Sequence, residues 1–208
     1  MIGETTSAPR RLTRAQQRVA TRTALLEATG RVLVEEGYVG LTTRRVAEVA
    51  GVAQSTLMHH FPTREALLVE TVTHLAMRLA DDALEQLDLS GLRSPQQRDA
   101  ILDQAWREFT SPPAIAAAQL WAAAWAEPEL AAALRELEER LGQLIAATAG
   151  TLFPDLADDP RFAPLLDASV SLIRGLVMAI PVSGQATVDA RWAAIKPILA
   201  DAAGRLLD

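Results

Sequence analysis

Apolar residues recur at helical spacing along most of the chain, and glycine, serine and proline residues separate one repeat from the next. This pattern predicts about nine helices and no strand. Their expected ranges are 13–37, 42–50, 54–60, 63–87, 95–109, 113–126, 129–152, 160–180 and 187–207. We therefore expect an all-α fold, with a small N-terminal three-helix unit followed by a larger helical domain.

The first expected helix has a recognisable start and a recognisable inner face. Thr13 followed three residues later by Gln16 is a capping-box pattern, in which each residue satisfies a free backbone N–H of the first turn. The apolar stripe consists of Leu25, Leu26, Ala28, Val32 and Leu33. We expect this helix to end near Gly37 and to support the two short helices that follow.

The next two expected helices are separated by a tight turn. Thr42 stands where a side-chain oxygen can cap the start of the first, and Gly51 stands where a left-handed residue commonly ends a helix. The second then runs from about Gln54 to His60. Two helices joined by a short turn with a glycine are typical of the DNA-binding helix-turn-helix, whose second helix lies in the major groove.

Helical geometry divides the residues of this second helix between two sides. Leu57 and Phe61 lie four apart and are expected to face inward as structural residues. The candidates for contact with base edges are Gln54, Ser55, Thr56 and His59.

The stretch at residues 40–68, GLTTRRVAEVAGVAQSTLMHHFPTREALL, resembles the N-terminal DNA-binding segment of the tetracycline-repressor (TetR) family. The resemblance is specific over about residues 13–68, and the remainder is similar in length, in helicity and in a segment at 120–137. It implies a homodimeric transcription regulator that binds a near-palindromic DNA operator and responds to a small-molecule effector. It does not identify the effector.

The resemblance also implies which residues grip the DNA backbone. They are a threonine at Thr42, a basic residue at Arg44 or Arg45, an aromatic residue in the recognition helix and a basic residue opening the next helix. This chain has Met58 instead of the usual tyrosine and Arg64 instead of the usual lysine, and Ala53 replaces a serine that often caps the recognition helix. The full set of expected DNA-binding residues is Thr42, Thr43, Arg44, Arg45, Gln54, Ser55, Thr56, Met58, His59 and Arg64.

Charge is distributed unevenly along the sequence. The whole chain has a net charge of -6, but residues 1–64 contain nine arginines and five glutamates, which gives +4 and leaves -10 for the rest. A basic N-terminal part on an acidic body would direct phosphate contact to one end. Arg10, Arg11 and Arg14 form either a mobile arm that reaches an adjacent groove or a tail, and we favour the tail.

Composition excludes several classes of protein. Half of the residues are hydrophobic and 22% are charged, which is typical of a globular chain, and the absence of cysteine excludes disulfides and thiolate metal sites. The most apolar late stretch, 175–182, is much shorter than the roughly 20 residues that span a membrane. We expect a soluble, cytoplasmic protein with no membrane partner.

Aromatic residues mark a candidate ligand pocket in the larger domain. Leu102, Trp106 and Phe109 share one helical face, and Trp121 and Trp125 lie four apart on the next helix. Such residues line pockets and build cores equally well, and the family resemblance favours a pocket. The neighbouring charged residues 107 and 108 are expected to point to solvent.

The expected helix at 160–180 has an apolar surface too broad for one partner, and Gly175 permits close approach of a second helix. We expect it to form a two-fold dimer interface with the last helix, a four-helix arrangement in the resembled family. The expected interface residues are Leu166, Ser169, Leu172, Ile173, Leu176, Trp192, Ile195 and Leu199. Arg174 pairs with Asp167, pairs with an acid of the partner copy or extends to solvent.

Catalytic chemistry has little support in the sequence. His59 and His60 are neighbours and face different directions, His74 stands alone, and no phosphate-binding glycine loop or nucleophile with a base is present. We expect no enzyme activity, no metal and no cofactor.

These observations predict a sequence-specific DNA-binding regulator, a repressor that a small, largely apolar ligand releases from its operator. The alternative is a helical ligand-carrier or protein-interaction dimer without sequence-specific DNA binding. The expected organisation is an N-terminal tail at 1–12, a helix-turn-helix domain at 13–62 and a ligand-binding and dimerisation domain at 63–208.

Overall fold

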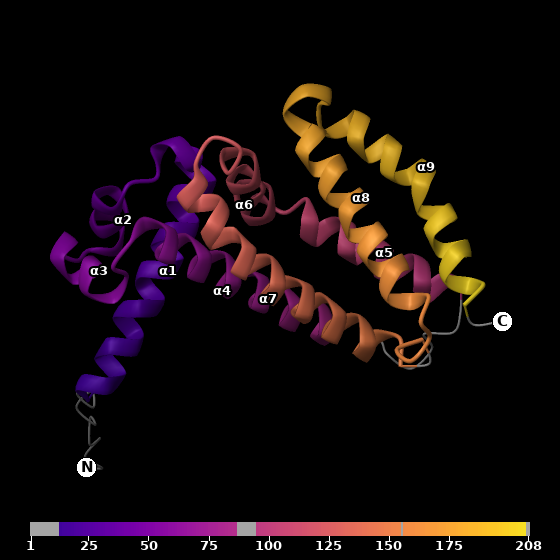
Figure 1. The fold of residues 1–208 in the computed structure, drawn as a ribbon, viewed down its shortest axis with the longest axis horizontal. Helices are drawn as coiled ribbons and strands as arrows, with labels where there is room; N and C mark the ends of the chain where they lie inside the picture. Colours follow the sequence, from indigo (N-terminus) through magenta and orange to yellow (C-terminus); the bar gives the residue numbers. More distant parts are fainter. Residues whose placement is uncertain (1–12, 87–94, 155, 207–208) are drawn as a thin grey trace, which may run out of the picture.

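The computed structural model describes residues 13–86, 95–154 and 156–206, and these residues form nine helices and no strand (Figure 1). The helices are α1 (Arg14–Gly40), α2 (Thr43–Ala50), α3 (Gln54–His60), α4 (Arg64–Gln86), α5 (Pro95–Phe109), α6 (Pro112–Ala123), α7 (Pro128–Leu152), α8 (Phe162–Ser183) and α9 (Gln185–Gly204). The all-α prediction is confirmed. The tail at 1–12 with Arg10 and Arg11, and the predicted helix ends at 87 and 207, lie outside the described residues.

Local sequence signals set the ends of the first helices. The Thr13 side chain accepts from the Gln16 backbone N–H at 3.2 Å, and the Gln16 side chain accepts from the Thr13 N–H at 2.9 Å, so the predicted capping box is present. At the other end, α1 is interrupted at Gly37, which has φ 69° and ψ -178°. This backbone conformation is accessible to glycine and not to residues with a Cβ, so the chain turns at the predicted position.

The short helices α2 and α3 also begin and end as predicted. The Thr42 hydroxyl accepts from the Arg45 N–H at 3.1 Å, and Gly51 closes α2 in the left-handed conformation, with φ 68° and ψ 30°. Ala53 precedes α3 without a side-chain cap, as expected from the missing serine. The turn between the two helices is therefore set by Gly51.

We call α1–α3 the head and α4–α9 the body. Figure 1 shows the head at one end of the molecule and the α8–α9 pair at the other, with α4 and α7 running side by side between them. One buried cluster unites Leu25 and Val32 of α1 with Leu57 of α3, Leu67 of α4 and Leu137 of α7. The head is thus packed directly on the body through α1, α4, α6 and α7.

A second, smaller buried cluster holds the far end of the body together. Trp106 of α5 stacks on Trp192 of α9 with ring centroids 5.0 Å apart and planes 8° apart, and Ile173 and Val177 of α8 pack beside them. This cluster joins α5, α8 and α9 into one unit.

Candidate functional site

The recognition helix α3 has one buried side and one exposed side. Leu57 is 0% and Phe61 1% exposed, which confirms the prediction that both are inward residues. Ser55, Met58 and His59 are exposed, as is Gln54, while Thr56 is half-buried. The head therefore presents a short row of polar side chains on a helix whose position is fixed by a tightly packed core.

Gln54 is positioned by the preceding helix. Its Nε2 donates to the Thr43 hydroxyl at 3.1 Å, which ties the first residue of α3 to the first residue of α2. This bond limits the rotamers available to Gln54. Glutamine and asparagine are the two side chains whose amide can bind adenine bidentately in the major groove. Both residues belong to the predicted DNA-binding set.

The two adjacent arginines of α2 are exposed and engaged by carboxylates. Arg44 donates to Glu48 at 3.1 Å, and Arg45 donates to Glu36 at 2.6 Å and lies 3.8 Å from Glu48. The hydrogen bond with Glu36 raises the pKa of Arg45. Since an arginine has five N–H donors, both side chains keep donors for a phosphate, but the neighbouring acids compete for their charge.

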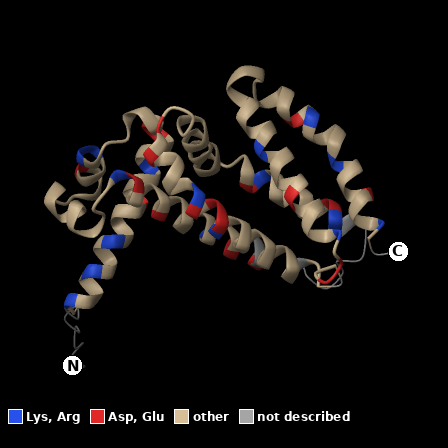
Figure 2. Ribbon diagram, viewed as in Figure 1, with Lys and Arg blue, Asp and Glu red and all other residues tan. Residues whose placement is uncertain are grey.

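A basic row continues along α1 toward its N-terminus (Figure 2). Arg14, Arg18 and Arg22 are spaced four apart, so they lie on one side of the helix. The Arg22 guanidinium lies over the Phe61 ring, 4.5 Å from its centroid, and 3.3 Å from Glu70. Burial lowers the pKa of His60, and His59, Arg18 and Arg22 lower it further. These surroundings therefore disfavour the charged form of His60.

Arg64 lies at the junction between the head and the body. Its Nη1 donates to the Tyr38 hydroxyl at 2.7 Å, its Nη2 to the Tyr38 carbonyl at 3.0 Å and its Nε to the Leu41 carbonyl at 3.2 Å. Its guanidinium also covers the Tyr38 ring at 4.3 Å from the centroid. The residue predicted to bind phosphate therefore holds the α1–α2 corner in this structure.

Two polar residues of the body complete this junction. The Tyr38 hydroxyl donates to Glu127 at 2.5 Å, and the Tyr38 backbone N–H, freed by the turn at Gly37, donates to Gln119 Oε1 of α6 at 2.9 Å. Burial, followed by the bond to Glu127, raises the pKa of Tyr38. Sequence reasoning missed Tyr38, Gln119 and Glu127, although the predicted break at Gly37 indicated where a backbone N–H would need a partner.

A cavity of about 410 Å³ lies within the body. It is lined by residues from α4 to α9, and nearly all of them are apolar. Of the predicted ligand-binding residues, Leu102, Phe109 and Trp121 line it. The size and apolar character fit a small-molecule site, whose usual range is about 300–1,000 Å³.

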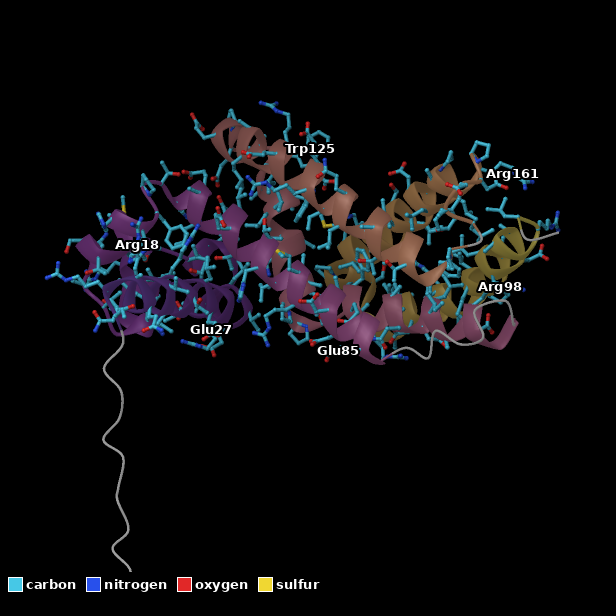
Figure 3. The ribbon with its side chains drawn as sticks, turned by 90° about the horizontal axis from the view of Figure 1, so that it is seen from below. Arg18, Glu27, Glu85, Arg98, Trp125 and Arg161 are labelled. Atoms are coloured by element: carbon cyan, nitrogen blue, oxygen red, sulfur yellow. The ribbon has the colours of Figure 1, made fainter. Side chains whose placement is uncertain are left out.

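The other two predicted ligand residues are not brought to the cavity. Trp106 is buried against Trp192, and its Nε1 donates to Asp189 at 3.1 Å, so it belongs to the core. Trp125 is 94% exposed at the turn between α6 and α7 and is absent from the cavity wall (Figure 3). The prediction was wrong here because α6 ends at Ala123, three residues earlier than expected, so Trp125 no longer shares a helical face with Trp121.

The predicted orientation of two charged residues also needs correction. Glu108 does not point to solvent: it lines the cavity and accepts a hydrogen bond from Gln104, which is 5% exposed. Arg174 pairs not with Asp167 but with Glu138 of α7, at 2.8 and 2.9 Å. Arg107, in contrast, is exposed as expected, and its Nη2 donates to Gln104.

Two of the residues expected at the dimer interface are buried within the single chain. Ile173 and Trp192 are 3% exposed within a single chain and therefore cannot contribute surface to an interface. Helical spacing identified the apolar residues, but these two face the chain's own core rather than a partner. One row of uncharged residues on α8 is exposed in the single chain. It consists of Pro164, Ala168, Ser171, Gly175, Met178 and Val182.

The remaining predicted interface residues are Leu166, Ser169, Leu172, Leu176, Ile195 and Leu199, and all six are half-buried.

The helix α8 is also long and apolar enough to cross a membrane by composition, with a mean hydropathy of 1.7 and 11% of its window buried. A single such helix is weak evidence for a membrane span. The exposed row of α8 from Pro164 to Val182 is spaced by 4, 3, 4, 3 and 4 residues, which is typical of a surface that packs against another helix. Among the described residues, no group of three or more histidine, aspartate or glutamate side chains is placed to hold a metal.

Comparison with known proteins agrees with this geometry. The family model for bacterial regulatory proteins of the tetR family matches residues 25–71, which include α2, α3 and the junction residues Tyr38 and Arg64. The HTH-type transcriptional regulator BetI of Rhizobium meliloti (strain 1021) is 28% identical over 177 residues, 80% of this chain and 83% of that protein. The HTH-type transcriptional regulator CymR of Pseudomonas putida is 34% identical over 79 residues, 38% of this chain and 39% of that protein.

Solved structures show the same fold. A TetR transcription regulator from Haloarcula marismortui ATCC 43049 superimposes with a TM-score of 0.66 at 17% identity, covering 88% of this chain and 98% of that one. The head with its recognition helix, the helical body and these similarities agree with one another. Residues 25–71 thus carry the N-terminal domain of the tetR family of bacterial regulatory proteins, and the chain as a whole is similar to HTH-type transcriptional regulators and shares the fold of solved regulators.

Proposed function

We propose that this regulator is a repressor, that it binds a near-palindromic operator as a homodimer, and that an apolar effector in the body cavity releases it. The observation that carries this proposal is that helices bordering the cavity also hold the α1–α2 corner of the head. Leu75 of α4 and Trp121 of α6 line the cavity. Arg64 of α4 and Gln119 of α6 bind Tyr38.

This arrangement gives a physical route from effector to DNA. Filling the cavity displaces α4 or α6, and either displacement shifts the hydrogen bonds at Tyr38 and with them the orientation of α2 and α3. A ligand that binds the displaced state more tightly lowers the affinity for DNA. Bound DNA lowers the affinity for the ligand by the same free energy, because the coupling between the two sites is reciprocal. Release therefore requires only a difference in ligand affinity between the two states.

For DNA contact we propose two groups of residues. The exposed residues Gln54, Ser55 and His59, with Thr56, face the bases. Thr42, Thr43, Arg44 and Arg45, with Met58 at the position of the aromatic residue, face the backbone. We assign Arg64 to the junction rather than to a phosphate, since each of its three nitrogens donates to Tyr38 or Leu41 within the chain and its guanidinium covers the Tyr38 ring.

For dimerisation we propose the exposed row on α8. Pro164, Ala168, Ser171 and Gly175 are small, and Cβ at position 175 would meet nothing within 4 Å, so a second helix can approach closely. Exposed Ile198 of α9 extends the apolar surface. With a two-fold axis at this row, we expect the two recognition helices to enter successive turns on one face of the DNA, roughly 34–36 Å apart. In this proposal the protein is cytoplasmic, α1–α3 bind DNA, and α4–α9 bind the ligand and form the dimer.

The first test is a fluorescence-anisotropy titration with duplex DNA from beside the protein's own gene and with a scrambled duplex, at about physiological salt. Tight binding confined to the native duplex supports the repressor. Equal, weak and strongly salt-dependent binding to both supports instead a ligand-carrier or protein-interaction dimer.

A further inference from the structure

The cavity wall contains one carboxylate, that of Glu108, for which the described residues provide no ion pair. Among the described lining residues two are charged, Glu108 of α5 and Arg174 of α8. The Glu108 carboxylate accepts from the neutral Gln104 amide, whose oxygen is in turn engaged by Arg107. The buried amide thus turns its NH₂ group toward Glu108 and fixes the carboxylate in the wall.

The charge of Arg174 is already compensated. Its Nη1 donates to both oxygens of Glu138, at 2.8 and 2.9 Å, and the Trp121 Nε1 donates to the same carboxylate at 2.5 Å. Its guanidinium also lies 5.6 Å from the centroid of the Trp121 ring. An anionic ligand would have to compete with Glu138 for this arginine.

The rest of the wall suits a cation with an apolar body. Aromatic rings of Phe109, Trp121, Phe153 and Phe162 line the cavity, and the last two meet edge to face at 6.0 Å. Aromatic faces attract cations that have lost water, and the aliphatic residues around them favour hydrocarbon. An ion in this wall requires an opposite charge, because burial of an isolated charge is costly.

We propose that the effector of this cavity is an apolar molecule carrying one protonated amine, which binds the Glu108 carboxylate while the apolar body fills the space between α4, α6, α7 and α8. This inference rests on the proposed function of the cavity as the effector site. It adds the chemical class of the ligand and the residue that selects it. Gln104 acts as a positioning residue that holds Glu108 toward the cavity.

Three probes of one chain length separate charge from apolar burial: decylamine, decanol and decanoate, each titrated by calorimetry into the full-length protein. We expect decylamine to bind about tenfold or more tightly than decanol, since a hydrogen bond to a charged group is worth that factor or more, and decanoate to bind more weakly than decanol. In Glu108→Gln the preference for decylamine over decanol should disappear while decanol binding is retained. Equal binding of decylamine and decanol to the unmodified protein, or an unchanged preference in Glu108→Gln, overturns the inference.

Glu85→Gln is the matched control. It makes the same chemical change on exposed α4 surface, outside the cavity wall (Figure 3), so it should leave the preference intact. Ile145→Trp tests location, because a larger ring at this half-buried lining position should weaken all three probes together. If decanoate binds most tightly, and Arg174→Gln abolishes that preference, the cavity selects an anion and the inference is wrong.

The pH dependence supplies an independent readout. Burial raises the pKa of Glu108, nearby Asp82 raises it further, and the Gln104 hydrogen bond and Arg107 lower it. Decylamine stays protonated between about pH 5 and pH 8 because alkylammonium groups titrate near 10.4. The ionised carboxylate binds it, so affinity should fall as pH decreases toward the raised pKa, and Glu108→Gln should remove this fall.

The outcomes distinguish this inference from the proposed function beneath it. Tight binding of decanol and decylamine alike leaves the cavity as an effector site and overturns only its selectivity for cations. No binding of any probe contradicts both. Specific DNA binding is measured separately and does not depend on either result.

Discussion

The head and the body differ in how completely the space between their helices is filled. In the head, Leu25, Val32 and Val46 are 0% exposed, as is Leu57 of the recognition helix. In the body, α8 and α9 have large exposed apolar residues such as Met178, Val182 and Ile198, and the space between the helices includes a cavity of about 410 Å³. The core beneath the recognition helix is closed within the single chain, whereas the body contains volume for a ligand and the exposed row of α8 that we propose as a dimer surface.

Under the proposed function, this difference lets one chain combine a rigid DNA-contacting surface with a ligand-responsive body. Recognition of bases needs side chains held within a fraction of an ångström, which a closely packed core provides. Control by a ligand needs a part of the molecule with two packings of similar free energy, and an incompletely filled body meets that need. The two regions meet at Tyr38, where Arg64, Gln119 and Glu127 converge.

The largest effect is expected from opening the core of the head. Phe61→Ala should lower the free energy of unfolding by about 3–5 kcal/mol, because it removes a fully buried ring and leaves a cavity. Met58→Ala, on the exposed side of the same helix, should change it by no more than about 0.5 kcal/mol. Chemical denaturation of both variants measures this. Similar losses in the two would mean that the head is not the closed unit described here.

A charge on the exposed row of α8 tests whether the body is incomplete without a partner. Gly175→Glu should weaken the dimer by about 3 kcal/mol or more, of order a hundredfold in its dissociation constant, because it buries an unpaired charge in the interface. Sedimentation velocity over a range of concentrations reports this. Gln143→Glu, at an exposed position of α7, is the control and should leave the dimer intact. A dimer that survives Gly175→Glu would place the interface elsewhere.

Removing the arginine at the boundary separates two roles for it. Arg64→Met should destabilise the protein by about 1–3 kcal/mol, because it leaves the Tyr38 and Leu41 carbonyls without their donor. Arg31→Met makes the same charge change at an exposed position of α1 and should have little effect on stability. Unchanged stability, with the slope of DNA affinity against salt reduced by about one, would instead identify Arg64 as a phosphate contact.

The smallest effect is expected at the reading surface itself. Glu48→Gln frees Arg44 and Arg45 from a competing carboxylate, so affinity for any DNA sequence should rise a few-fold, equivalent to less than about 1 kcal/mol. Glu27→Gln makes the same charge change at an exposed position of α1. An equal rise in both variants would show that net charge, rather than release of these arginines, is responsible.

The sequence predicts the head more completely than the body for physical reasons. Capping at Thr13 and Thr42, the left-handed Gly51 and the inward pair Leu57 and Phe61 are local, because each depends on residues within a few positions along the chain. The nine helices follow from the same local signals. Trp106 was predicted to line the ligand pocket and Trp192 to lie in the dimer interface, but the two rings stack on each other in the core. The reason is that helical spacing gives the period of an apolar face but not which neighbour covers it.

Long-range polar contacts lie beyond such reasoning. The bonds of Tyr38 to Gln119 and Glu127 join residues more than 80 positions apart, and that of Arg174 to Glu138 joins two separate helices. Nothing in the neighbourhood of Glu108 distinguishes a cavity wall from a solvated helix face. These contacts depend on the packing of the body, which the spacing of apolar residues does not determine uniquely.

We propose that a dimer of this chain reads two half-sites of DNA with its α3 helices. The most direct test is selection of bound duplexes from a random-sequence pool by the full-length protein at about physiological salt, followed by sequencing. We expect enrichment of a near-palindrome whose half-sites are centred about one helical turn apart, and loss of this enrichment in Gly175→Glu. A pool that gains no common sequence, despite a folded and dimeric protein, would contradict this proposal.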